Sequence, residues 1–166
     1  MDISMLITVC IGVLIAGMAG YFIYLQRKGV TQEQYLKKES NGLPLQAYER
    51  LILLVDRIAL PNIIQRNASE GLAAYDMQFI LNKIIRDEFD YNITQQIYVS
   101  PESWKAVKNL KEQNLLVLNQ IGQSIAAGAS GLDFQKAVLN YLMHEPKSNL
   151  HELVSEALSY EAKKLL

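Results

Sequence analysis

The sequence predicts an all-α protein, in which one N-terminal transmembrane helix is followed by a compact bundle of about five helices. Two observations support this fold class. Residues 3–25 contain no charged side chain, and the apolar residues after position 43 recur at the spacing of three and four residues that is typical of helices. We therefore divide the chain into an anchor at 1–26, a charged connector at 27–42 and a helical domain at 43–166.

The uncharged segment 3–25 is long enough to cross the ~30 Å hydrocarbon core of a membrane as a helix. Basic residues follow it, and none precedes it. This bias predicts that the N-terminus lies outside and that the helical domain is cytoplasmic. A cleaved signal peptide would have a basic start and a shorter apolar core, so we expect a retained anchor in the lipid bilayer. The basic residues are Arg27, Lys28, Lys37 and Lys38.

Small residues within the anchor suggest assembly with another helix. Gly12, Ala16 and Gly20 lie four residues apart and would form a ladder on one helix face, which lets a second membrane helix approach closely. Gly and Ala are also common in membrane helices in general, so chance is an alternative explanation. If the ladder is a contact, the partner is another membrane protein subunit or a second copy of the chain.

Helix signals divide the domain into five expected helices. Ser100 is well placed as an N-cap, with Pro101 at the first helical position of the third helix. Asn149 and Glu152 form a pattern that resembles a capping box at the start of the last helix. The five expected ranges are 45–58, about 73–98, 101–125, 134–142 and 149–165.

A ladder of polar residues interrupts the apolar stripe of the second expected helix. Glu88, Asn92 and Gln96 lie four residues apart on the face that carries Leu81 and Ile85, and Asn114 lies between apolar residues of the next helix. Polar side chains on an apolar face either pair with one another or open onto a partner or ligand. We favour an internal network at a joint between two helices, and a pocket lined by these residues is the alternative.

Composition argues against most catalytic and nucleic-acid-binding classes. The formal net charge is −1, which provides no basic patch for nucleic acid. Cys10 is the single cysteine, so a disulfide or a cysteine-based zinc site within one chain is excluded. Glycine-rich phosphate loops and GxSxG motifs do not occur. We expect no enzymatic activity and no cofactor.

Two short clusters could in principle bind a metal or transfer protons. The pairs His144-Glu145 and His151-Glu152 are separated by Pro146 and by the expected cap, so they should lie on different helices and should not converge. The acidic run Asp87, Glu88 and Asp90 lies next to Lys83 and Arg86 and is typical of a solvated, ion-paired face. We expect neither a metal site nor a catalytic residue here.

Several ordered motifs resemble a family of small uncharacterised proteins from Bacteroidota, each with one N-terminal transmembrane helix and a helical C-terminal domain. The motifs are LQAYERLILLVDRI at 45–58, IIRDEFDYNITQQIYVSPESWKAVKNLKEQ at 84–113 and GLDFQKAV at 131–138. The resemblance implies a bacterial inner-membrane location. It implies no activity, cofactor or catalytic residue.

The sequence therefore favours a single-pass inner-membrane protein whose cytoplasmic helical domain is an adaptor or accessory subunit of a larger complex. One alternative is a ligand-binding or enzymatic domain with a polar pocket around Glu88, Asn92 and Gln96. The other is a homo-oligomeric membrane scaffold. A closed, paired polar network would favour the adaptor, and an open cavity at the same residues would favour the pocket.

Overall fold

The computed structural model describes residues 17–25, 42–68, 71–144 and 150–166. The regular structure in these ranges is helical, apart from one isolated bridge between Ala73 and Ser130. The predicted all-helical class is therefore confirmed for the described residues. The chain divides into two compact units, Met1–Gly42 and Leu43–Leu166.

The transmembrane part of the prediction is contradicted. No helix among the described residues is both long and apolar enough to cross a membrane. Within the expected span the structure describes residues 17–25, which are helical. This finding contradicts the expected single-pass anchor, and with it the orientation and the inner-membrane location that depended on the anchor. Gly12 and Ala16 lie outside the described residues, and a Cβ added at Gly20 would meet nothing within 4 Å.

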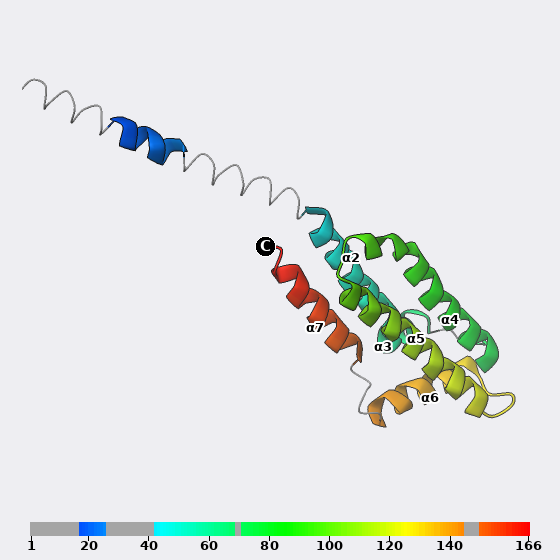
Figure 1. The fold of residues 1–166 in the computed structure, drawn as a ribbon. Helices are drawn as coiled ribbons and strands as arrows, with labels where there is room; N and C mark the ends of the chain where they lie inside the picture. Colours follow the sequence, from blue (N-terminus) through cyan, green and yellow to red (C-terminus); the bar gives the residue numbers. More distant parts are fainter. Residues whose placement is uncertain (1–16, 26–41, 69–70, 145–149) are drawn as a thin grey trace, which may run out of the picture. The chain divides into compact units, whose positions relative to one another are not determined.

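The second unit is built from helices joined by short connections (Figure 1). The two main differences from the expected helices are an additional helix and an earlier helix end. A short helix, α3, follows the first helix of the domain, and the long second helix ends at Tyr91 rather than near Tyr98. The elements are α2 (Gly42–Ile58), α3 (Leu60–Arg66), α4 (Ala74–Tyr91), the 3₁₀ helix η1 (Ile93–Ile97), α5 (Pro101–Ser124), α6 (Gly131–His144) and α7 (Leu150–Lys163).

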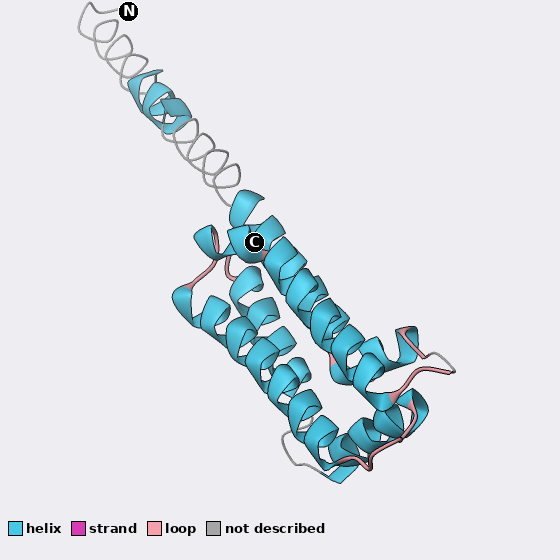
Figure 2. Cartoon of the chain, turned by 90° about the vertical axis from the view of Figure 1, so that its right-hand side faces the viewer, coloured by secondary structure: helices cyan, strands magenta, loops and turns pink. Residues whose placement is uncertain are grey.

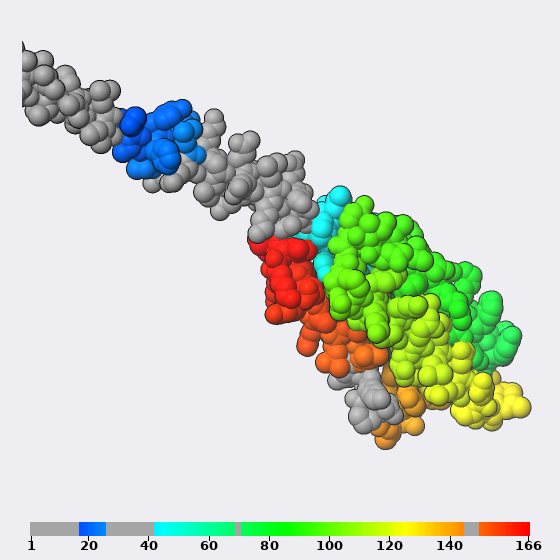
Figure 3. Space-filling model, in the orientation of Figure 1, coloured from blue at the N-terminus to red at the C-terminus, as the bar shows by residue number. Residues whose placement is uncertain are grey.

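α4 and α5 form the centre of this unit. They pack closely against each other, and α6 contacts both of them near the end of α5 (Figure 1). Figure 2 shows the helices of this unit from a second direction. α7 runs along α5 and forms one flank of the unit, shown in red to orange in Figure 3. α2 contacts the bundle through large buried side chains, among them Tyr48 and Leu51.

The hydrophobic core includes side chains from α2 to α7. Apolar residues three and four positions apart turn one stripe of each amphipathic helix toward the interior. Each fully buried Leu, Ile or Phe side chain contributes about 1.5–3 kcal/mol relative to an exposed one. The largest fully buried side chains include Leu51, Ile58, Ile63, Leu81, Ile85, Leu110, Leu118, Phe134 and Leu158.

The break between α2 and α3 has a local cause at Pro61. Proline has no backbone N–H that could donate to the carbonyl of Arg57, four residues earlier, so α2 cannot continue regularly through Pro61 and ends at Ile58. The last carbonyl groups of α2 then lack their usual partners. Side chains supply them instead: Asn62 Nδ2 donates to the Asp56 carbonyl at 3.0 Å, and Arg66 donates to the carbonyl of Arg57.

Candidate functional site

The polar ladder expected on one helix face is divided among three different environments. Glu88 accepts a hydrogen bond from Arg57 Nε at 2.9 Å, which joins α4 to α2. Asn92 is buried and ends α4, where its Nδ2 donates to the Glu88 carbonyl at 2.9 Å. Gln96 lies exposed in η1. The backbone leaves the α-helical path at Asn92, so the spacing of four residues no longer keeps Gln96 on the buried face.

Asn114 also finds its partner outside that ladder. Its Nδ2 donates to the carbonyl oxygen of Ile58 at 2.8 Å, at the end of α2. Gln95, next to the expected Gln96, is the buried member of η1. The structure therefore brings Glu88 and Asn92 together and places Gln96 and Asn114 elsewhere. Asn114 borders a small cleft of about 30 Å³ between α5 and its neighbours.

The helix cap expected at the start of α5 is present in the structure. Ser100 Oγ accepts a hydrogen bond from Ser103 N at 3.2 Å, and Pro101 is the first residue of α5. The backbone N–H of Ser100 donates to the hydroxyl of Tyr48 at 3.1 Å, so the same turn is connected to α2. Asn149 lies outside the described residues, and Glu152 is exposed in the first turn of α7.

The two histidines do not converge within the described part of the chain. His144 Nδ1 contacts the carbonyl oxygen of Asn140 at 2.8 Å at the end of α6. His151 is half-buried in the first turn of α7. Among the described residues there is no group of three or more His, Cys, Asp or Glu side chains that could hold a metal ion.

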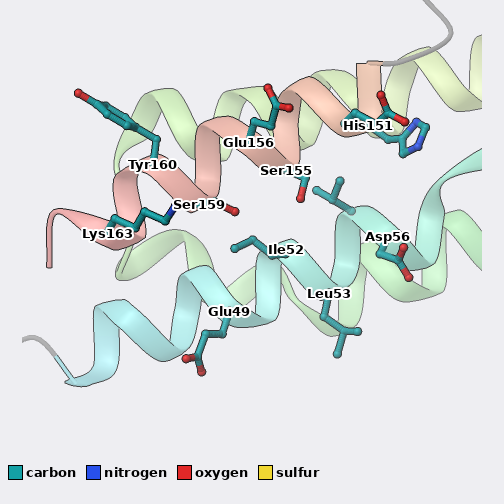
Figure 4. A pocket seen from close by; sticks show the side chains of 12 residues that line it. Glu49, Ile52, Leu53, Asp56, His151, Ser155, Glu156, Ser159, Tyr160 and Lys163 are labelled. Carbon is teal, nitrogen blue, oxygen red and sulfur yellow. The ribbon is translucent and has the colours of Figure 1, made fainter. Parts of the chain in front are cut away.

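A groove of about 880 Å³ lies between α2 and α7 (Figure 4). It is open along one side, and we call it the α2–α7 groove. Its α2 wall consists of Glu49, Ile52, Leu53, Val55 and Asp56. Its α7 wall consists of His151, Glu152, Ser155, Glu156, Ser159, Tyr160 and Lys163.

Helical periodicity explains why each wall is continuous. The positions 49, 52, 53 and 56 of α2 are separated by three, one and three residues, which places them on one side of that helix. The positions 152, 155, 156, 159 and 163 of α7 repeat the same pattern over three turns. Both walls therefore present a regular stripe of side chains along the groove.

Small side chains create the space between the walls. Figure 4 shows Ser155 and Ser159 of α7 and Ile52 of α2 directed toward the gap between the two helices. An adjacent face of α7 carries Val154 and Leu158 into the core. Two serines one turn apart leave room that larger side chains would fill, so α7 and α2 do not close over each other.

The groove combines apolar and acidic groups. Leu53 is 56% exposed although it belongs to a helix with an extensive buried face, and Tyr160 on the opposite wall is 64% exposed. The acidic residues of the two walls outnumber the single lysine, Lys163. They are Glu49, Asp56, Glu152 and Glu156.

One feature of the sequence could have indicated this groove. The run LILLV at 51–55 contains five consecutive apolar residues, which is too many for the single buried stripe of an amphipathic helix. At least one of them had to face away from the core. The structure identifies Leu53 as the exposed member and Ile52 as half-buried.

Comparison with known proteins assigns the chain to a family. The model of a family described as "Family of unknown function (DUF7935)" matches residues 1–165. The chain belongs to the DUF7935 family. No curated protein and no solved structure matches it. The expected membership of an uncharacterised family is thus confirmed. The match does not show that the family comes from Bacteroidota or that its members are membrane proteins.

Proposed function

We propose that the helical domain of this protein is an adaptor that binds a helix of a partner protein in the α2–α7 groove. The observation that carries this proposal is the exposure of Leu53 on the wall of an open groove of about 880 Å³. A large apolar side chain in a concave surface gains free energy when a partner covers it, at about 25 cal/mol per Å² of buried apolar area.

The arrangement of the walls fits a helical segment. Two neighbouring helices with a shallow channel between them accept a third helix, whose side-chain ridge lies between them. Recognition of this kind uses apolar anchors at i, i+3, i+4 and i+7 of the bound helix. Ile52 and Leu53 supply the apolar surface that such anchors would contact.

The proposal also explains how the helical domain could serve as an accessory subunit without chemistry of its own. The groove provides apolar, hydroxyl and carboxylate groups on two rigid helices. These groups suit binding, because specificity arises from shape and charge. An adaptor then acts by holding its partner in a larger assembly.

Site-specific photo-crosslinking in the native cells tests this function. A photoreactive benzoylphenylalanine replaces Ser159 in the full chain, and in the matched control it replaces Ser124, which is exposed at the end of α5. We expect position 159 to give an adduct with one defined partner protein that position 124 does not give.

Three results would overturn the proposal. Position 159 could give no adduct, which would indicate that the groove is not covered in cells. Both positions could give the same adducts, which would indicate nonspecific contact. An adduct with the mass of two copies of this chain would replace the adaptor with a homo-oligomeric scaffold.

A further inference from the structure

The charges along the α2–α7 groove specify the chemistry of its occupant. Resting on the proposed function, we propose that the bound segment is a basic amphipathic helix of a partner protein, about two to three turns long. Its apolar side contacts Ile52 and Leu53, and its Lys or Arg side chains reach the carboxylates of the two walls.

Several acidic residues outside the groove pair with basic side chains of the domain, whereas the acidic groups of the groove do not, among the described residues. Four ion pairs are described in the structure: Glu88 pairs with Arg57, Asp87 with Lys83, Glu112 with Lys111, and Glu161 with Lys164. None of the four groove carboxylates takes part in an ion pair among the described residues.

The local hydrogen bonds do not neutralise this charge. Asp56 accepts a hydrogen bond from Asn62 Nδ2 at 2.8 Å, which is a neutral donor. Lys163, the single lysine of the walls, is exposed near the end of α7. An open channel with excess carboxylates attracts basic segments and repels acidic ones, which contributes to both association rate and specificity.

The dimensions of the walls set the length of the occupant. Along α2 the lining positions extend from Glu49 to Asp56, which corresponds to about 10 Å of helix. Along α7 they extend from His151 to Lys163, or about 18 Å. A helix that follows the groove therefore places about 7–12 residues between the walls.

The same charges argue against a second copy of this chain as the occupant through the same face. In a symmetric dimer the same patch lies on both sides of the interface. The carboxylates of one α2–α7 groove would then face those of the other, and like charges in an interface oppose association. A basic helix instead brings charges of the opposite sign to these carboxylates.

Binding of synthetic peptides to the full chain tests this inference. Three helical peptides of about 14 residues share the same leucine stripe and differ in their flanking residues, which are all Lys, all Gln or all Glu. Fluorescence anisotropy at increasing salt gives the dissociation constants. At low salt we expect the Lys peptide to bind about tenfold more tightly than the Gln peptide and the Glu peptide to bind most weakly. The difference should shrink as salt increases.

Paired variants locate the effect in the groove. Asp56→Asn with Glu156→Gln removes one carboxylate from each wall and should abolish most of the advantage of the Lys peptide. Asp76→Asn with Asp90→Asn changes the net charge by the same amount on exposed positions of α4 and should preserve that advantage. Leu53→Gln, which alters no charge, should weaken all three peptides.

The outcomes separate this inference from the function on which it rests. If the Lys and Gln peptides bind equally and Leu53→Gln weakens both, the groove binds helices and the basic preference is wrong. If the two charge variants lose the advantage equally, the attraction is a property of net charge and the groove assignment is wrong. If no peptide binding responds to Leu53→Gln, the groove is not a helix-binding site and the proposed function falls as well.

Discussion

The side-chain amide of Asn114 in α5 donates a 2.8 Å hydrogen bond to the carbonyl oxygen of Ile58, 56 residues earlier in the chain. Both residues are buried. The carbonyl lies in the last residue of α2, and the last carbonyl groups of a helix have no partner within it. Asn114 therefore satisfies an orphaned carbonyl group and at the same time joins α2 to the centre of the bundle.

Asn114→Ala should lower the free energy of unfolding by about 1–3 kcal/mol, because the Ile58 carbonyl would remain buried without this partner. Urea unfolding of the full chain measures the change. Asn109→Ala is the matched control, since Asn109 is exposed on the same helix, and its effect should stay within about 0.5 kcal/mol. Equal effects at the two positions would contradict the role of the hydrogen bond.

Asn92 and Gln96 should respond differently to the same substitution. Asn92→Ala removes the bond from Nδ2 to the Glu88 carbonyl and should cost about 1 kcal/mol, visible as a lower melting temperature. Gln96 is exposed, so Gln96→Ala should have almost no effect. A melting temperature that is unchanged or higher for Asn92→Ala would indicate that Asn92 serves binding rather than stability.

Gly122 and Gln78 should be energetically coupled. A Cβ at Gly122 would lie 2.1 Å from Gln78 Oε1, so Gly122→Ala displaces the Gln78 side chain, whose Nε2 donates to Asn119 at 3.0 Å. The gain in helix propensity, up to about 1 kcal/mol, is then offset by the lost hydrogen bond. In a Gln78→Ala background the same substitution should stabilise the protein. A double-mutant cycle by urea unfolding measures the coupling, and identical effects in both backgrounds would exclude it.

The start of α6 should make stability depend on pH through Asp133. Hydrogen bonds from the Ser130 hydroxyl, at 2.7 Å, and from the Ser130 N–H lower the pKa of the Asp133 carboxyl below its ordinary value of 3.8. A lowered pKa in the folded state stabilises the protein above pH 3.8, and this contribution is lost as the pH falls through the lowered pKa.

The corresponding measurement compares the wild-type protein with Asp133→Asn. The wild type should have the higher melting temperature near neutral pH, and the difference should decrease in acid as Asp133 becomes protonated. A difference that stays constant into the acid range would show that the charge of Asp133 contributes nothing to the cap.

Tyr48 should contribute through its hydroxyl as well as its ring. The hydroxyl accepts a hydrogen bond from Ser100 N at 3.1 Å, which ties α2 to the cap of α5. Tyr48→Phe retains the buried ring and removes this acceptor, so it should cost about 1–3 kcal/mol in urea unfolding. Tyr75→Phe is the control, because Tyr75 is 76% exposed, and an equal cost there would remove the basis for this assignment.

Local signals in the sequence account for most of the helices. The start of α5 follows from Ser100 and Pro101, since a hydroxyl that accepts an N-terminal N–H and a residue without an N–H both suit a first turn. Apolar periodicity likewise indicates the amphipathic helices α2, α4, α5 and α7. Such signals involve residues within one or two turns, so their outcome depends little on the rest of the chain.

The end of α4 shows where local reasoning stops. Periodicity extends the helix to Tyr98, yet the chain leaves the α-helical path at Asn92 and continues as η1. The side chain of Asn92 caps the helix by donating to the Glu88 carbonyl. The turn after Tyr98 is bound to α2 by the hydrogen bond from the Ser100 N–H to the Tyr48 hydroxyl. Tyr48 of α2 lies far from this turn in the sequence, so the periodicity of α4 cannot indicate the contact.

What the sequence by itself determined is therefore the helical class, the approximate helices and the surplus of apolar residues at 51–55. The tertiary structure decided which of those residues became exposed, because the rest of the bundle covers Leu51, Leu54 and Val55 and leaves Leu53 uncovered. It also decided that Ser155 and Ser159 lie opposite Ile52. A groove is a relationship between two surfaces, and the distance between α2 and α7 depends on side chains packed beneath both helices, which no stretch of either helix encodes.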